Sequence, residues 1–262
     1  MVIPKTFKGA VLVETGADVR IIDGIHIPEL NRGQVLVKIR YAGLCHSQLM
    51  EVRGMRGHDA YLPHLLGHEA LGTVVKVGGD VSKIKIGNDV ILGWIKSDGI
   101  DAGGCVYTGP QGELINSGAV TAFSEYAVVS ENRLVLKPPH TPDRLCVLYG
   151  CALPTGAGLV FNELVPEKNA HIAVIGLGGI GLSALMACKE FEPQTLIAID
   201  IEDEKLALAK DIGATHIFKS DDSYLLSKIK DITGGAGVDY AVEAVGLTKT
   251  IELGFDLIKR GG

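Results

Sequence analysis

Aromatic residues make up only 5% of this 262-residue chain, and no apolar run is long enough to cross a membrane. Acidic residues outnumber basic ones, 31 against 25, and no basic stripe appears, so the electrostatic footprint of a nucleic-acid-binding protein is missing. Residues 1–8 also lack the hydrophobic stretch of a signal peptide. We therefore expect a cytoplasmic protein with no nucleic-acid partner and no membrane partner.

Cysteine is scarce, and the chain has no group of four closely spaced cysteines. A structural zinc site uses four clustered ligands, so the sequence predicts no structural zinc. In a cytoplasmic protein, cysteines are expected to be free thiols or metal ligands rather than disulfides. The five cysteines are Cys45, Cys105, Cys146, Cys151 and Cys188.

An apolar content of 47% is ample for a large core, and the chain length suggests about two domains. Short strand-like runs in the first half are separated by glycine, aspartate and asparagine, which predicts a β-rich, barrel-like or sandwich-like domain. Apolar side chains alternate over residues 35–41, as in a half-buried strand. The expected strands of this half are residues 7–13, 34–42, 72–77, 89–92 and 124–129.

The pattern changes near Thr155, where strands and helices begin to alternate. This alternation predicts an α/β domain with a doubly wound parallel sheet, so we expect domains at residues 1–154 and 155–262. A complete dinucleotide-binding fold has about six strands, and only four are found, so the second domain is expected to be incomplete at its C-terminus. The expected strands are residues 171–175, 196–200, 215–218 and 240–245, and the expected helices are residues 182–191, 205–212, 224–232 and 250–258.

A glycine-rich segment lies between the first strand and the first helix of the second domain. In such a motif the first glycine makes the tight turn, the second admits a pyrophosphate, and the third lets helix and strand pack closely. The free N–H groups of the helix N-terminus then face the phosphates. A glycine-rich turn without a ligand is the alternative. The expected cofactor contacts here are Gly176, Gly178, Gly179, Ile180 and Gly181.

An acidic residue, Asp200, ends the next expected strand, about 20 residues after the glycine motif. A carboxylate there binds the ribose hydroxyls of the adenosine and repels a 2′-phosphate, which favours NAD over NADP. Lys205 is a candidate for a second ribose contact, and a solvated helix lysine is an equally good interpretation of it.

Three distant residues form a candidate metal site: Cys45, His68 and Cys151. Two cysteines and one histidine are the ligands of a catalytic zinc ion whose fourth position stays open. Their spacing is not that of a zinc finger, so the fold must bring them together. Taken singly, each cysteine is better interpreted as a small buried hydrophobe, and His68 as a hydrogen-bonded core histidine.

The segments around these residues resemble the zinc-containing medium-chain alcohol dehydrogenases. Residues 67–69 (Gly-His-Glu), followed by Gly72 and Gly78, resemble the signature of that family. Residues 43–47 resemble the segment that carries its first zinc ligand, and residues 150–158 the segment that carries the remaining cysteine. The resemblance covers nearly the whole chain, and it implies an N-terminal GroES-like domain followed by a Rossmann domain.

The resemblance also implies roles for single residues. One zinc ion held by Cys45, His68 and Cys151 would lower the pKa of an alcohol bound in its open position. Ser47 would pass the alcohol proton towards solvent, and Glu69 would lie beside the metal, as a transient ligand or as an electrostatic partner outside the ligand shell. Two further residues are implied as cofactor contacts: His46 at the pyrophosphate and Thr155 near the nicotinamide.

The chain departs from the family at position 48, where Gln48 replaces an aspartate that orients the zinc-binding histidine. Glutamine can accept a hydrogen bond through its carbonyl but carries no charge, which lowers the expected metal affinity. Relatives also continue beyond this kind of C-terminal segment, so the chain is expected to be C-terminally truncated. The parent enzyme is expected to be a homo-oligomer.

The sequence therefore predicts a zinc-dependent oxidoreductase that transfers a hydride between NAD and an alcohol, aldehyde or ketone. One alternative is the same chemistry on a glutathione adduct of formaldehyde. Another is a catalytically silent NAD-binding or interaction fragment.

Overall fold

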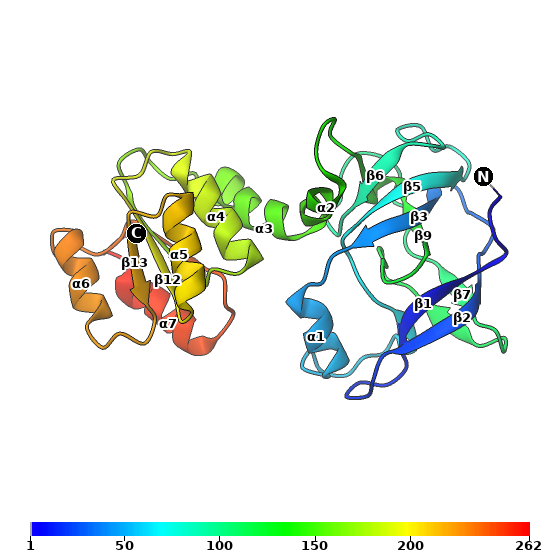
Figure 1. Ribbon diagram of the computed structural model, residues 1–262, viewed down its shortest axis with the longest axis horizontal. Coiled ribbons are helices and arrows are strands. Elements are labelled where there is room, and N and C mark those ends of the chain that lie inside the picture. The colour runs from blue at the N-terminus through cyan, green and yellow to red at the C-terminus, as the bar shows by residue number, and fades with distance from the viewer. Residues whose placement is uncertain (1) are drawn as a thin grey trace. The chain divides into compact units, whose positions relative to one another are not determined.

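The computed structural model describes residues 2–262, which form two compact units that meet in sequence between Cys151 and Ala152 (Figure 1). The first unit is β-rich. Five of its strands form a closed barrel in the order β1-β2-β7-β8-β4, and five form a second sheet in the order β10-β6-β5-β3-β9. Most of the strand pairs in this unit are antiparallel, and β4 pairs with β8 in parallel.

The strands of the first unit differ greatly in length, and its helices are short. The barrel strands are β1 (Thr6–Leu12), β2 (Arg20–His26), β4 (His64–Leu65), β7 (Val106–Thr108) and β8 (Leu114–Asn116). The second sheet has β3 (Gln34–Ala42), β5 (Ala70–Val77), β6 (Asp89–Leu92), β9 (Tyr126–Ser130) and β10 (Leu134–Leu136). The helical segments are α1 (His46–Val52), η1 (Glu131–Arg133), α2 (Asp143–Cys146) and η2 (Val147–Gly150).

Strand β3 is buried on both faces at its start, not on one face as its alternation predicts. Val35 and Val37 pack in the core of the second sheet, whereas Leu36 packs with Phe7 and Tyr107 in a separate core. The alternation is real, but both sides of the strand are covered by protein in this region. Only the end of the strand is open, where Tyr41 is 41% exposed.

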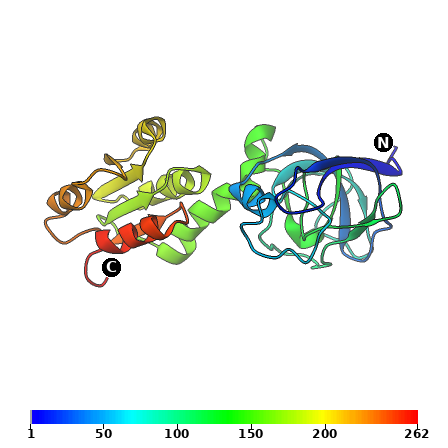
Figure 2. The same cartoon turned by 90° about the horizontal axis from the view of Figure 1, so that it is seen from below.

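The second unit contains a four-stranded parallel sheet in the order β13-β12-β11-β14. Side chains of the central strands alternate between two cores, with Ile172 and Val174 in one and Ala173 and Ile175 in the other. Helices α4 and α5 contribute to the first core, and α6 and α7 to the second, so helices cover both faces (Figures 1 and 2). This confirms the predicted α/β architecture with a parallel sheet.

The predicted strands and helices of the second unit lie close to their expected positions, whereas its first two helical segments were not predicted. Its strands are β11 (His171–Ile175), β12 (Thr195–Asp200), β13 (His216–Lys219) and β14 (Tyr240–Glu243). Its helices are α3 (Ala152–Leu159), η3 (Val160–Leu164), α4 (Gly179–Lys189), α5 (Asp203–Ile212), α6 (Leu225–Ile232) and α7 (Thr248–Leu257). Over residues 2–262, no single helix is long and apolar enough to span a membrane, and one bent helix pair, Asp143–Gly150 with Ala152–Leu164, meets that test of length and composition.

Candidate functional site

The first unit brings the three expected metal ligands together. The two sulfur atoms of Cys45 and Cys151 and one ring nitrogen of His68 all lie within 4.8 Å of one another. Cys45 directly precedes α1, His68 lies between β4 and β5, and Cys151 follows η2. The fold therefore assembles from distant segments a cluster with the ligand types of a three-residue zinc site.

The ring of His68 has the properties that a metal ligand needs. Its Nε2 atom is buried and has no hydrogen-bond partner within the described part of the chain, whereas Nδ1 lies 2.6 Å from Nε2 of Gln48. Burial, and after it the charge of Arg56, lowers the pKa of His68, which favours the neutral ring that binds metals. A bound cation would satisfy the buried Nε2 atom, so these residues fit a zinc ion.

Glu69 packs against one of the cysteine-bearing segments and is hydrogen-bonded to the other. It is 3% exposed, and a Cβ atom placed on Gly150 would lie 2.7 Å from the Cβ of Glu69, so only glycine fits before Cys151. The N–H of Gly43 donates to the backbone oxygen of Glu69 at 3.0 Å. Glu69 thus helps to position both cysteine segments, and its expected role as a transient ligand stays a prediction.

Two further expected residues lie on α1, next to Cys45. Ser47 is half-buried and its Oγ atom accepts a hydrogen bond from Nε2 of Gln48 at 3.2 Å. His46 is exposed at the first position of the helix. The contact of His46 with a cofactor stays a prediction.

A cavity of about 320 Å³ in the first unit is lined by His68 and Gln48 together with Glu51, Asp59 and His64. His64 is buried, its Nε2 lies 2.9 Å from Oδ2 of Asp59, and Oδ1 of Asp59 accepts from the N–H of Tyr61. Burial opposes ionisation of Asp59, but these hydrogen bonds outweigh it and lower its pKa. These polar residues were not expected, because nothing in their spacing marks them as a group.

The glycine motif forms the turn between β11 and α4 in the second unit. A Cβ atom on Gly181 would overlap the carbonyl oxygen of Gly176, so packing alone requires glycine there. Gly178 directly precedes α4, has an ordinary φ of −74°, and a Cβ atom on it would meet nothing within 4 Å. The fold gives no reason for glycine at position 178, whereas a close approach by a phosphate does. Gly179 and Ile180 form the first turn of α4.

Asp200 holds this turn in place from the end of β12. It is 8% exposed, Oδ2 accepts from the N–H of Leu177 at 2.7 Å, and Oδ1 accepts from the N–H of Glu202 at 3.0 Å. Nζ of Lys205 donates to the carboxylate of Glu202 at 2.7 Å, and this hydrogen bond raises the pKa of Lys205.

Oγ1 of Thr155, on α3, is buried without a hydrogen-bond partner among the residues that the structure describes.

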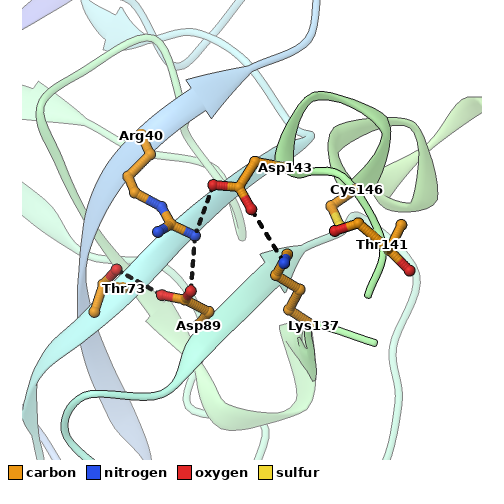
Figure 3. A network of polar contacts seen from close by, with 7 residues as sticks. All are labelled: Arg40, Thr73, Asp89, Lys137, Thr141, Asp143 and Cys146. Atoms are coloured by element: carbon orange, nitrogen blue, oxygen red, sulfur yellow. Dashed lines mark hydrogen bonds and ion pairs between the residues drawn. The ribbon is translucent and has the colours of Figure 1, made fainter. Parts of the chain in front are cut away.

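A network of ion pairs fastens the segment that leads to Cys151 (Figure 3). Arg40 on β3 lies 2.9 Å from Asp89 on β6 and 3.4 Å from Asp143, the first residue of α2. Lys137 pairs with the other oxygen of Asp143 at 3.1 Å. Asp143 therefore connects α2, and through η2 the predicted ligand Cys151, to the sheet.

Replacing Asp143 by asparagine is expected to lower the free energy of unfolding of the first unit by about 1 kcal/mol, because two ion pairs of a network lose their shared partner. Chemical denaturation measures this change. Asp23→Asn is the matched control, because within residues 2–262 Asp23 pairs with Lys8 alone, at 3.6 Å, and its side chain is 76% exposed. Equal losses in the two variants would show that the network contributes no more than an isolated surface pair.

Comparison with known proteins gives the same architecture. Residues 31–139 match the alcohol dehydrogenase GroES-like domain, and residues 179–262 match the zinc-binding dehydrogenase domain. The chain is 30% identical to an S-(hydroxymethyl)glutathione dehydrogenase of a Synechocystis species, over 97% of this chain and 75% of that protein. It is 32% identical to zinc-type alcohol dehydrogenase B of Aspergillus flavus, over 90% of this chain and 58% of that protein.

Solved structures of similar proteins include an alcohol dehydrogenase zinc-binding domain protein from Burkholderia ambifaria, with a TM-score of 0.87 and 32% identity over 97% of this chain and 74% of that chain. A benzyl alcohol dehydrogenase from Acinetobacter calcoaceticus follows, with a TM-score of 0.85 and 29% identity over 98% of this chain and 75% of that chain.

Proposed function

Because this chain belongs to the zinc-containing medium-chain alcohol dehydrogenases and is a zinc-dependent oxidoreductase, we propose that Cys45, His68 and Cys151 hold its single zinc ion and that the turn at residues 176–181 binds NAD. The observation that carries the zinc assignment is the meeting of two cysteine sulfurs with a histidine whose Nε2 is buried and unpartnered. The reaction is hydride transfer between a small alcohol, or the corresponding carbonyl compound, and NAD.

The bound zinc supplies a Lewis acid for the substrate oxygen, and NAD supplies the hydride acceptor. The protein residues orient these groups and move the proton. Ser47 takes the proton that leaves the alcohol, since its half-buried hydroxyl lies on α1 beside the residue that contacts His68. The acid Glu69, next to His68 in sequence, would add negative charge near a cation held by these ligands.

Metal analysis together with an assay for NADH formation tests this function. We expect one zinc ion per chain and NADH production from at least one member of a panel of small primary, secondary and aromatic alcohols. A zinc-loaded protein that binds NAD but oxidises no alcohol and reduces no aldehyde would contradict the proposal.

Ser47→Ala is expected to leave zinc bound and to slow alcohol oxidation by about 100-fold, because a positioned acid–base group is lost. Steady-state rates with deuterated alcohol, which report whether hydride transfer limits turnover, provide the measurement. Ser227→Ala is the control, since Ser227 is exposed on α6 and, among the residues that the structure describes, its hydroxyl donates to the Tyr224 carbonyl. An unchanged rate under hydride-limited turnover would assign the proton to another group.

NAD is expected to bind more tightly than NADP by on the order of tenfold or more, because the Asp200 carboxylate at the end of β12 repels a 2′-phosphate. Asp200→Asn should lower the ratio of the NADP dissociation constant to the NAD dissociation constant. Its amide oxygen can still accept from the Leu177 N–H. Titration of both cofactors against the unmodified protein and this variant provides the test. A preference for NADP in the unmodified protein would refute the assignment of Asp200.

A further inference from the structure

The side-chain amide of Gln48 contacts His68, the histidine that we assign to zinc, through a hydrogen bond that zinc binding would not allow. The Gln48 side chain is 7% exposed and enclosed by three partners. The amide nitrogen lies 2.6 Å from Nδ1 of His68 and 3.2 Å from Oγ of Ser47, and the amide oxygen accepts the N–H of Cys45 at 3.2 Å. An amide nitrogen only donates, so in this arrangement Nδ1 of His68 accepts and the proton of the neutral ring resides on Nε2.

Coordination through Nε2 reverses this arrangement. The lone pair of Nε2 must then face the metal, so the proton has to reside on Nδ1 and be donated to a neighbour. Two donors would then oppose each other 2.6 Å apart, at Nδ1 of His68 and the amide nitrogen of Gln48. The only acceptor that Gln48 can offer to His68 is its amide oxygen.

We propose that zinc binding at His68 requires the side-chain amide of Gln48 to turn over, which transfers its single acceptor oxygen from the Cys45 N–H to the His68 Nδ1–H. Gln48 is thus a positioning residue that weakens the metal site, because one oxygen has to serve two donors. This inference rests on the proposed zinc site.

This weakening of zinc binding arises because residue 48 is an amide and not a carboxylate. After the turn, the amide nitrogen faces the N–H of Cys45, which loses its acceptor at the N-terminus of α1. A carboxylate of the same length has two acceptor oxygens and can serve both donors at once. Gln48→Glu is therefore expected to bind zinc about 10–100-fold more tightly, the range for partners that orient metal-binding histidines. Gln48→Met, whose thioether sulfur is only a weak acceptor, is expected to bind it more weakly than the unmodified protein.

Three measurements on the full chain, metal-free and zinc-loaded, test the proposal: zinc affinity by competition with a chromophoric chelator, the ring tautomer of His68 by nitrogen NMR, and exchange of the Cys45 amide proton. In the unmodified protein we expect the ring proton to move from Nε2 to Nδ1 and the Cys45 amide to exchange faster on zinc loading. In Gln48→Glu we expect the proton on Nδ1 and a protected Cys45 amide in both states.

Leu44→Glu controls for added charge, since position 44 is 87% exposed and next to Cys45. We expect it to change neither the tautomer nor the exchange. The proposal is overturned if metal-free unmodified protein already carries the proton on Nδ1, or if Gln48→Glu binds zinc no more tightly than Leu44→Glu. Equal zinc binding by the unmodified protein and Cys45→Ser would instead refute the metal site itself.

Discussion

Replacing Cys151 by serine is expected to empty the metal centre and to lower alcohol oxidation by about 10³-fold, because a Lewis acid contributes several kcal/mol to the transition state. Two ligands, Cys45 and His68, would remain, and a hydroxyl is a poor substitute for a thiolate at zinc. Zinc content by elemental analysis and NADH formation are the two measurements.

Cys146→Ser is the matched control for this experiment. Cys146 is a buried cysteine of the same unit, but its sulfur donates to the Thr141 carbonyl and lies outside the three-ligand cluster (Figure 3). We expect this variant to keep its zinc and its activity. Full zinc occupancy in Cys151→Ser would contradict the assignment of Cys151 as a ligand.

Gly178→Ala is expected to lose NAD affinity, whereas Gly181→Ala is expected to lose folding stability. At position 178 the added methyl meets nothing in the protein, so stability should hold while NAD affinity falls by about 10–100-fold, the cost of crowding the phosphate by 1–3 kcal/mol. At position 181 the methyl overlaps the Gly176 carbonyl, so the second unit should lose about 3 kcal/mol of folding free energy.

Thermal unfolding and NAD titration separate these outcomes. Zinc content serves as the internal control, because every proposed zinc ligand belongs to the first unit. Unchanged NAD affinity in Gly178→Ala would show that the glycine turn does not contact the cofactor.

The second unit was largely predictable because its signals are local. Strands such as β11 are short apolar runs that end in glycine, and the helices between them have their own periodicity, so strand 171–175 was predicted with its observed bounds. The first unit was harder. Strands β7 and β8 have three residues each and are defined by pairing with each other, and α1 has only seven residues, too few for a clear pattern.

The candidate site was predictable to the extent that family resemblance singled out its ligand-type residues. The residues around these ligands were not predictable, because their positions depend on how segments distant in the sequence pack together. The sequence predicts that Gln48 accepts a hydrogen bond from His68, whereas the structure turns its nitrogen towards the ring. Glu51, Asp59 and His64 line one cavity because a loop brings α1 and β4 together, and the hydrophobic pattern of the sequence does not predict the path of that loop.

The three proposed metal ligands come from segments that are remote in the chain, and the last of them, Cys151, is also the final residue of the first unit. An ion bound there is a cross-link: it closes loops that the unfolded chain leaves open, as a disulfide would, but it can be reversed by a chelator. Metal supply would then set the folding stability of this unit as well as its chemistry.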